Sequence, residues 1–174
     1  MEPTVLVAYA TRSGSTAELA QTVAEILHEQ GMKAEVLPAR EIHSTPQASA
    51  VVLVAALYMG QLHRDARRFL RCYRTRLTEV PVALFVPGPV QNQEKDWTGA
   101  RQQLDRQLAK FPWFSPVATK IVGGVWNPAR LGFPFKWIPV LRNMKAMDAR
   151  DWDAIRAAVR DVAACLQAAL HAHA

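Results

Sequence analysis

Hydrophobic residues follow two alternating patterns along the chain. Short runs without polar alternation, of which AVVLVAA at 50–56 is the clearest, are typical of strands that are covered on both faces. Together with a shorter stretch at 33–37, such runs predict strands at residues 4–9, 33–37, 50–56, 81–86 and 117–125. Hydrophobic residues spaced three or four apart predict helices at residues 16–30, 63–77, 97–110 and 151–170.

The order of these elements predicts the architecture. Strands that alternate with helices indicate a parallel sheet with helices on both faces, because parallel neighbours need crossover connections. We therefore predict an α/β fold, a doubly wound five-stranded parallel sheet, in a single domain that spans residues 1–174. Ligands of such folds bind beyond the carboxyl ends of the strands. The loops at 10–16, 57–62 and 87–96 each follow a strand and are expected at that edge.

The first of these loops, TRSGST, is rich in hydroxyl groups. A helix start exposes unpaired amides and a partial positive charge, so a preceding loop with small side chains can hold a phosphate. Gly14 permits close approach of the backbone. The alternative is a helix cap with a permissive turn. The residues predicted to bind phosphate are Thr11, Arg12, Ser13, Gly14, Ser15 and Thr16.

Missing motifs narrow the choice of phosphate compound. The loop lacks the Gly-Lys-Ser/Thr ending of nucleotide triphosphatases, and no Gly-x-Gly-x-x-Gly of dinucleotide-binding folds occurs in the chain. The third strand ends in Ala55, Ala56 and Leu57, without the aspartate of a phosphoacceptor receiver domain. A terminal monophosphate remains.

The loop resembles the Thr/Ser-x-Thr/Ser-Gly-x-Thr loop with which flavodoxins hold the phosphate of FMN, and the chain has the length of a flavodoxin. A longer stretch, VVLVAALYMGQLHRDARRFL, is similar to the corresponding segment of the flavodoxin-like, menaquinone-dependent protoporphyrinogen dehydrogenases. Gly60, His63 and Phe69 of this chain match the pattern of that group. IVGGVWNPARLGF and DWDAI resemble that group as well.

Three departures from that group stand out. Ala56 replaces a serine, and Met59 stands where the group has an aromatic residue, with Tyr58 one place earlier. The segment between Lys136 and Asp151 is shorter than the resemblance leads us to expect.

The resemblance implies FMN as the cofactor, with its ring between the second and third loops. Tyr58 could stack on the ring and Met59 could offer a polarizable surface, or the two could simply cover the edge of the core. The flavin carries out the redox step, so we assign no catalytic residue. His63 either donates a proton to the substrate or orients it, or it caps the following helix. The implied ring contacts are Leu57, Tyr58, Met59 and Gly60 on one side and Pro87, Gly88, Pro89 and Val90 on the other.

The same resemblance implies an oxidoreductase that passes electrons from a porphyrinogen through FMN to a quinone. The alternative is a flavodoxin-type electron carrier that docks to redox proteins. Familiar carriers are acidic, whereas this chain has a net charge of +6, which favours the enzyme and an anionic partner. Nucleic acid is not expected, because no recognition motif accompanies the charge.

Two basic segments have open interpretations. The arginine-rich helix at 63–77 attracts propionates or anionic lipid, or is a solvated face. Residues 130–147 interleave Lys and Arg with Phe, Trp and Leu, which is typical of a segment that rests on a membrane surface; the alternative is a loop packed on the sheet edge.

Cys72 and Cys165 lie in separate helical patterns, so we expect buried thiols, without a disulfide or a metal site. No hydrophobic run approaches the roughly 20 residues that span a bilayer, and the N-terminus lacks the pattern of a secretory signal. These observations predict a cytoplasmic protein, with peripheral contact at the inner face of the membrane if 130–147 binds lipid.

Overall fold

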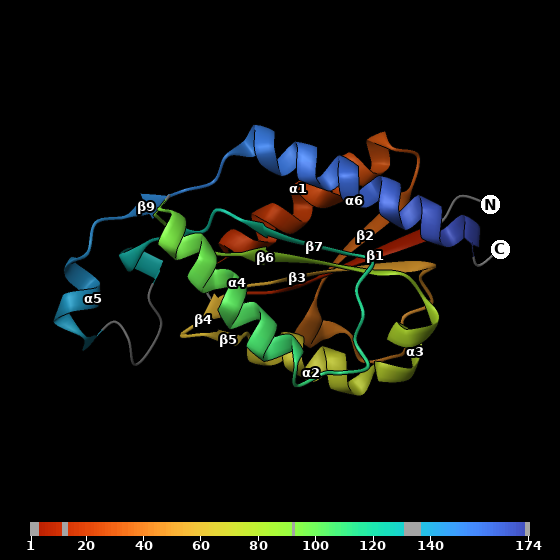
Figure 1. Ribbon diagram of the computed structural model, residues 1–174, viewed down its shortest axis with the longest axis horizontal. Coiled ribbons are helices and arrows are strands. Elements are labelled where there is room, and N and C mark those ends of the chain that lie inside the picture. The colour runs from red at the N-terminus through yellow and green to blue at the C-terminus, as the bar shows by residue number, and fades with distance from the viewer. Residues whose placement is uncertain (1–3, 12–13, 92, 131–136, 173–174) are drawn as a thin grey trace.

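The computed structural model describes residues 4–11, 14–91, 93–130 and 137–172. Its main sheet has five parallel strands in the order β2–β1–β3–β6–β7 (Figure 1). This arrangement confirms the predicted doubly wound α/β fold, and each predicted strand is present with small changes at its ends. The strands are β1 (Thr4–Ala10), β2 (Lys33–Pro38), β3 (Ala50–Ala55), β6 (Val82–Pro87) and β7 (Ala118–Val122).

Helices cover both faces of the sheet. In Figure 1, α1 (Ser15–Glu29) and α6 (Trp152–Ala172) lie above it, and α2 (Arg64–Cys72) and α3 (Arg74–Glu79) lie below. The lower layer also includes α4 (Glu94–Leu108), whose Leu104 belongs to that side of the core. Every residue of β3 is buried, which explains its uninterrupted hydrophobic run.

Alternate residues of the central strands supply two separate cores. Val52 and Val54 of β3 pack with α1 and α6, whereas Val51 and Leu53 pack with the helices of the opposite face. Because successive side chains of a strand point to opposite faces, one run of aliphatic residues fills both layers.

The ends of α1 and α6 follow their sequence signals. Gly31, with a φ of +75°, ends α1, and the amide of Met32 donates to the carbonyl of Leu27 at 3.0 Å. The carboxylate of Asp151 accepts from the amides of Asp153 at 3.1 Å and Ala154 at 3.0 Å, so it caps α6.

The helix predicted at 63–77 is two helices, α2 and α3, separated at Tyr73. Tyr73 has a φ of −110°, its ring lies 5.1 Å from the ring of Phe69, and its hydroxyl donates to the carbonyl of Ile42 at 2.7 Å. These contacts to the core and to a distant loop hold Tyr73 where helical spacing alone would have continued the helix.

The prediction of buried cysteines is wrong, since both thiols are free and exposed. The buried positions of α6 are Ile155, Val159, Val162, Ala163 and Leu166, and residue 165 falls outside this stripe. Cys72 likewise lies beside the buried stripe of α2 rather than on it. In the described parts of the chain, no helix is both long and apolar enough to cross a bilayer.

The carboxyl ends of β6 and β7 meet in a close backbone cluster. The amide of Gly88 donates to the carbonyl of Val122 at 2.8 Å, and the amide of Gly124 donates to the carbonyl of Pro89 at 2.9 Å. The predicted strand at 117–125 therefore stops at Val122, and the two glycines that follow redirect the chain.

A small excursion begins after these glycines. β8 (Val125–Trp126) pairs antiparallel with β9 (Met147–Asp148), and the amide of Ala149 donates to the carbonyl of Gly124 at 3.0 Å. Between the two strands in sequence lie η2 (Pro128–Arg130) and α5 (Pro139–Asn143), at the left of Figure 1.

The close approach at Gly123 leads to a stability prediction. A Cβ at this position would lie 1.9 Å from the carbonyl oxygen of Ala149, so the backbone would have to move. We expect Gly123→Ala to lower the free energy of unfolding by about 1–3 kcal/mol or more, measured by urea denaturation.

Gly99→Ala is the matched control. A Cβ at Gly99 in α4 would meet nothing within 4 Å, and alanine is favoured over glycine in a helix by about 1 kcal/mol. Its urea midpoint should stay the same or rise. Equal midpoints for the two variants would contradict the tight contact at Gly123.

Candidate functional site

The candidate site lies where the strand order reverses, at the carboxyl ends of β1 and β3. Ala10 and Ala55, the last residues of these strands, are register partners, so the loops that follow them leave the sheet from adjacent points. Ligands of doubly wound folds bind in the crevice that such a reversal creates.

The first loop approaches the start of α1 with a left-handed residue. Gly14 has a φ of +87° and is the N-cap residue of α1. Its amide donates to the hydroxyl oxygen of Thr11 at 3.0 Å, and its carbonyl accepts from the amide of Ala17 at 3.0 Å. Glycine has no side-chain oxygen with which to cap the first amides of the helix, so an anion can approach them. Arg12 and Ser13 lie outside the described residues.

Thr16 provides the test of whether these residues fit a phosphate. Its side chain is 1% exposed, and its hydroxyl has no hydrogen-bond partner in the part of the chain that the structure describes. A buried polar group left unpaired costs roughly 1–3 kcal/mol. A phosphate oxygen at the first turn of α1 would satisfy this hydroxyl, so the loop fits the phosphate of FMN.

The second loop is a hairpin rather than an irregular loop. β4 (Leu57–Tyr58) pairs antiparallel with β5 (Gln61–Leu62). The two residues between them, Met59 and Gly60, have φ values of 48° and 74°. Positive φ at both central residues is the geometry of the two-residue turn that matches the twist of a hairpin. The turn leaves Met59 90% exposed at its tip.

His63 caps α2, which is one of the two roles expected for it. Its Nδ1 accepts from the amide of Asp65 at 3.2 Å and lies 3.7 Å from the Asp65 carboxylate. Its ring meets Tyr58 edge to face, with ring centres 6.0 Å apart. When the ring is neutral, an accepting Nδ1 places the proton on Nε2.

A cavity of about 440 Å³ lies between the second and third loops and the start of α4. Four of the predicted ring contacts line it: Leu57, Gly88, Pro89 and Val90. Tyr58, Met59, Gly60 and Pro87 do not line it. Gly60 faces α4 instead, where a Cβ on it would lie 3.8 Å from the side chain of Gln103.

The sequence prediction did not name the residues that α4 supplies to this cavity, which are Lys95, Asp96, Gly99, Ala100 and Gln103, nor Gln91 in the loop before the helix. One carboxylate oxygen of Asp96 is buried and has no hydrogen-bond partner among the described residues. The predicted start of the helix at 97 left Asp96 in the loop. Acidic residues are common at helix starts because they interact favourably with the helix dipole. The sequence pattern therefore did not indicate that Asp96 also lines the cavity.

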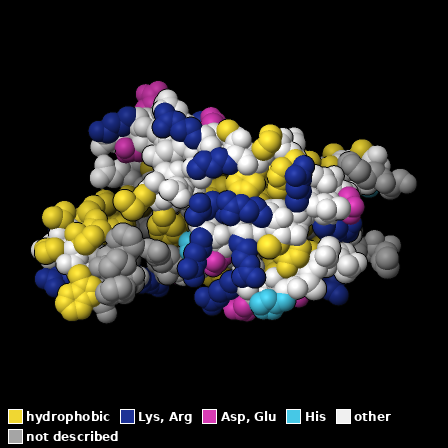
Figure 2. All heavy atoms as spheres, turned by 90° about the horizontal axis from the view of Figure 1, so that it is seen from below, with side chains coloured by type: hydrophobic (Ala, Val, Ile, Leu, Met, Phe, Trp, Pro, Cys, Tyr) yellow, Lys and Arg dark blue, Asp and Glu magenta, His cyan; other side chains and the backbone are white. Residues whose placement is uncertain are grey.

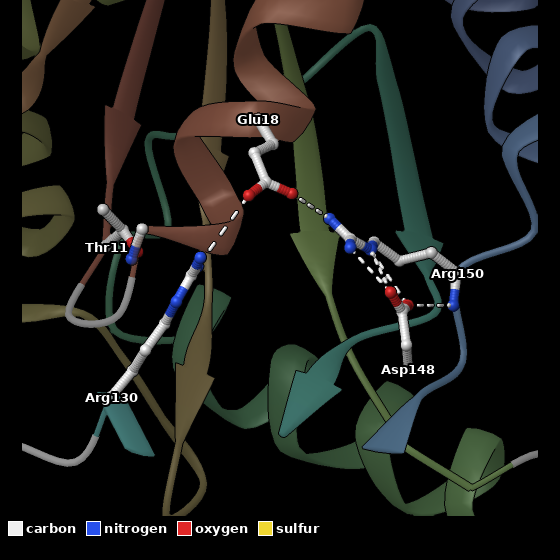
Figure 3. A network of polar contacts seen from close by, with 6 residues as sticks. Thr11, Glu18, Arg130, Asp148 and Arg150 are labelled. Carbon is white, nitrogen blue, oxygen red and sulfur yellow. Dashed lines mark hydrogen bonds and ion pairs between the residues drawn. The ribbon is translucent and has the colours of Figure 1, made fainter. Parts of the chain in front are cut away.

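A chain of charged side chains, also missed, stands beside the first loop (Figure 3). Glu18 of α1 lies between two arginines, with Arg150 at 2.6 Å and Arg130 at 3.8 Å from its carboxylate oxygens. Arg150 also binds Asp148 at 2.6 Å, and its guanidinium lies 4.8 Å from the ring centre of Trp152. The network joins the start of α1 to η2, β9 and the start of α6.

The close ion pair between Arg150 and Asp148 shifts the pKa values of both groups. The side-chain hydrogen bond from Arg150 lowers the pKa of the Asp148 carboxyl from its ordinary value, and the same bond raises the pKa of Arg150. Both groups therefore stay charged across the physiological range. Among the described residues, no cluster of three or more His, Cys, Asp or Glu side chains could hold a metal ion.

Comparison with known proteins gives three kinds of match. The family described as Flavodoxin domain matches residues 6–148. Protoporphyrinogen IX dehydrogenase (quinone) from Escherichia coli is 25% identical over 170 residues, which cover 91% of this chain and 93% of that protein.

Solved flavodoxins have the same fold at lower identity. A cysteine-to-alanine mutant of flavodoxin from Pseudomonas aeruginosa has a TM-score of 0.57 at 16% identity, with 94% of this chain and 99% of that chain covered. Oxidised flavodoxin 1 from Bacillus cereus has a TM-score of 0.55 at 14% identity, with 94% and 97% covered. The chain therefore belongs to the flavodoxin domain family, whose cofactor is FMN, as the resemblance of its first loop to flavodoxins implied.

Proposed function

We propose that this flavoprotein is an oxidoreductase that passes electrons from a porphyrinogen through FMN to a quinone. The observation that carries FMN binding is the buried hydroxyl of Thr16, which has no hydrogen-bond partner among the described residues and lies beside the left-handed Gly14. The choice of substrates is supported by the similarity to protoporphyrinogen IX dehydrogenase (quinone), which extends over 91% of the chain.

The first loop would hold the phosphate. The hydroxyls of Thr11, Ser15 and Thr16 would donate hydrogen bonds to it, and so would the first amides of α1, at the positive end of the helix dipole. We extend this role to Arg12 and Ser13, which complete the predicted loop.

The cavity beside β4 would hold the flavin ring. Leu57 and the segment from Gly88 to Val90 form apolar walls, and Lys95 and Asp96 form a polar wall. Tyr58, Met59 and Gly60 would border the ring from the hairpin, with Pro87 at the end of β6. When bound, FMN accepts a hydride or electrons and delivers them to an acceptor. The protein's part is to orient the ring, exclude water from one side of it and offer polar partners at its edge.

The segment around α5 would meet the membrane in which a quinone dissolves. Four large hydrophobic side chains are exposed here, Trp137 and Val140 at 72%, Ile138 at 42% and Met144 at 38%. Figure 2 shows hydrophobic side chains gathered at the end of the molecule where α5 lies, beside Lys and Arg. The exposed basic residues Arg142 and Lys145 suit an anionic lipid surface.

Thr16→Val tests the phosphate loop, because valine has a similar shape but no hydroxyl. Loss of a hydrogen bond to a charged group, worth roughly 1.5–3 kcal/mol, should weaken FMN binding about ten- to a hundredfold. Riboflavin, which lacks the phosphate, should bind with little change. Titration of flavin fluorescence measures both affinities.

Two controls make this result specific. The urea midpoint of the apoprotein should stay the same or rise in Thr16→Val, because only an unpaired polar group is lost. Thr22→Val, in the same helix and partly buried, should leave both affinities unchanged. Equal losses for FMN and riboflavin would refute the phosphate assignment.

An anaerobic assay tests the reaction. Protein loaded with FMN should oxidise protoporphyrinogen only when a menaquinone analogue is present, and protoporphyrin fluorescence measures the product. Protein without flavin is the control. Tight FMN binding without turnover would favour the alternative, a flavodoxin-type electron carrier that docks to redox proteins.

Sedimentation with lipid vesicles tests the membrane contact. The protein should bind vesicles of phosphatidylcholine with phosphatidylglycerol more strongly than vesicles of phosphatidylcholine alone. Trp137→Ala combined with Val140→Ala should weaken binding by about tenfold or more, because each side chain buries apolar surface on insertion. Val117→Ala removes a hydrophobic residue that is 41% exposed elsewhere and should have no effect. Binding that ignores the double substitution would rule out this surface.

A further inference from the structure

We infer that Arg130 is a second source of phosphate recognition, reaching the first loop from η2 and favouring FMN over flavins without a phosphate. This inference rests on the proposed binding of FMN at that loop. It concerns a side chain that lies outside the loop, in a segment that returns to the site after β7.

The guanidinium of Arg130 lies close to Gly14. One of its terminal nitrogens, Nη1, lies 3.6 Å from the point that a Cβ on Gly14 would occupy. The space left by the missing side chain of Gly14 is thus bordered by a cation. An anion at the start of α1 would meet the loop backbone on one side and this guanidinium on the other.

The buried hydroxyl of Thr16 is an independent sign of a ligand at the same place. It belongs to the first turn of α1, is 1% exposed and has no hydrogen-bond partner among the described residues. An oxygen-rich anion could accept from this hydroxyl and from the forked guanidinium at once, which suits a phosphate.

Glu18 holds Arg130 loosely. The Arg130 nitrogen is 3.8 Å from the Glu18 carboxylate, whereas the Arg150 nitrogen is 2.6 Å from it. Arg150 is fixed in turn by Asp148 and by the ring of Trp152, and its side chain is only 13% exposed. Arg130, at 48%, is the more exposed of the two partners of Glu18.

The charges around the loop explain why such a residue is needed. A phosphate at the start of α1 comes close to the carboxylate of Glu18, which would repel it. Arg150 and Arg130 balance the carboxylates of Glu18 and Asp148. Without Arg130 the network would carry a net negative charge next to the phosphate, so its loss should affect FMN and spare riboflavin.

Arg130→Gln tests this assignment on the apoprotein by titration of flavin fluorescence. We expect FMN binding to weaken by about tenfold or more at low ionic strength, since a charge-assisted hydrogen bond is lost. Riboflavin binding should change little. The salt dependence of FMN binding should also become shallower, because one ionic contact with the phosphate is gone.

Arg160→Gln is the matched control, since it removes the same charge from an exposed position of α6. It should leave both affinities unchanged. Equal loss of FMN and riboflavin in Arg130→Gln, or no loss of either, would overturn the inference while FMN binding by the unmodified protein upheld the proposed cofactor site. Failure of the unmodified protein to bind FMN would overturn both.

Discussion

Parallel pairing of β1 with both β2 and β3 is the constraint on which the site depends. Parallel strands need crossover connections, which bring the chain back to the same end of the sheet before each new strand starts. The reversal of strand order after β2 places the ends of β1 and β3 side by side, at Ala10 and Ala55. The hydroxyl-rich loop and the hairpin β4–β5 leave from these two points. Their closeness is a property of the topology and not of their own residues.

The first loop and the hairpin are built mainly from backbone and uncharged groups. Burial in the adjacent sheet offsets the free energy that their unfavourable features cost. Positive φ at Met59 and a buried hydroxyl at Thr16 without a partner among the described residues are each unfavourable in isolation. Both follow closely after β1 or β3, and every residue of β3 is buried. The ionic network at Glu18 adds a second support, because it connects the first helix with η2 and with the segment that leads into α6.

The sequence predicted those features that local pattern determines. Strands such as β3 were evident because burial on both faces demands uninterrupted aliphatic residues. The first loop could be proposed to bind phosphate because hydroxyls and a glycine stand between a strand and a helix. The break at Tyr73 depends on a hydrogen bond to the distant Ile42, and the turn at Met59 lacks the Asn-Gly or Asp-Gly signal of such hairpins. Arg130 reaches Gly14 from another part of the chain, which periodicity cannot reveal.

The segment that starts at β8 ends at β9, the strand with which β8 pairs. Because β8 pairs with β9 and Ala149 bonds to Gly124, the two ends of this insert are fastened together whatever lies between them. A loop whose two ends are held together can change in length at a small entropic cost, about 0.6 kcal/mol for each doubling of its length. Evolution can therefore shorten or extend the α5 region to suit different surroundings. Arg130, only a few residues beyond β8, would keep its place through such changes.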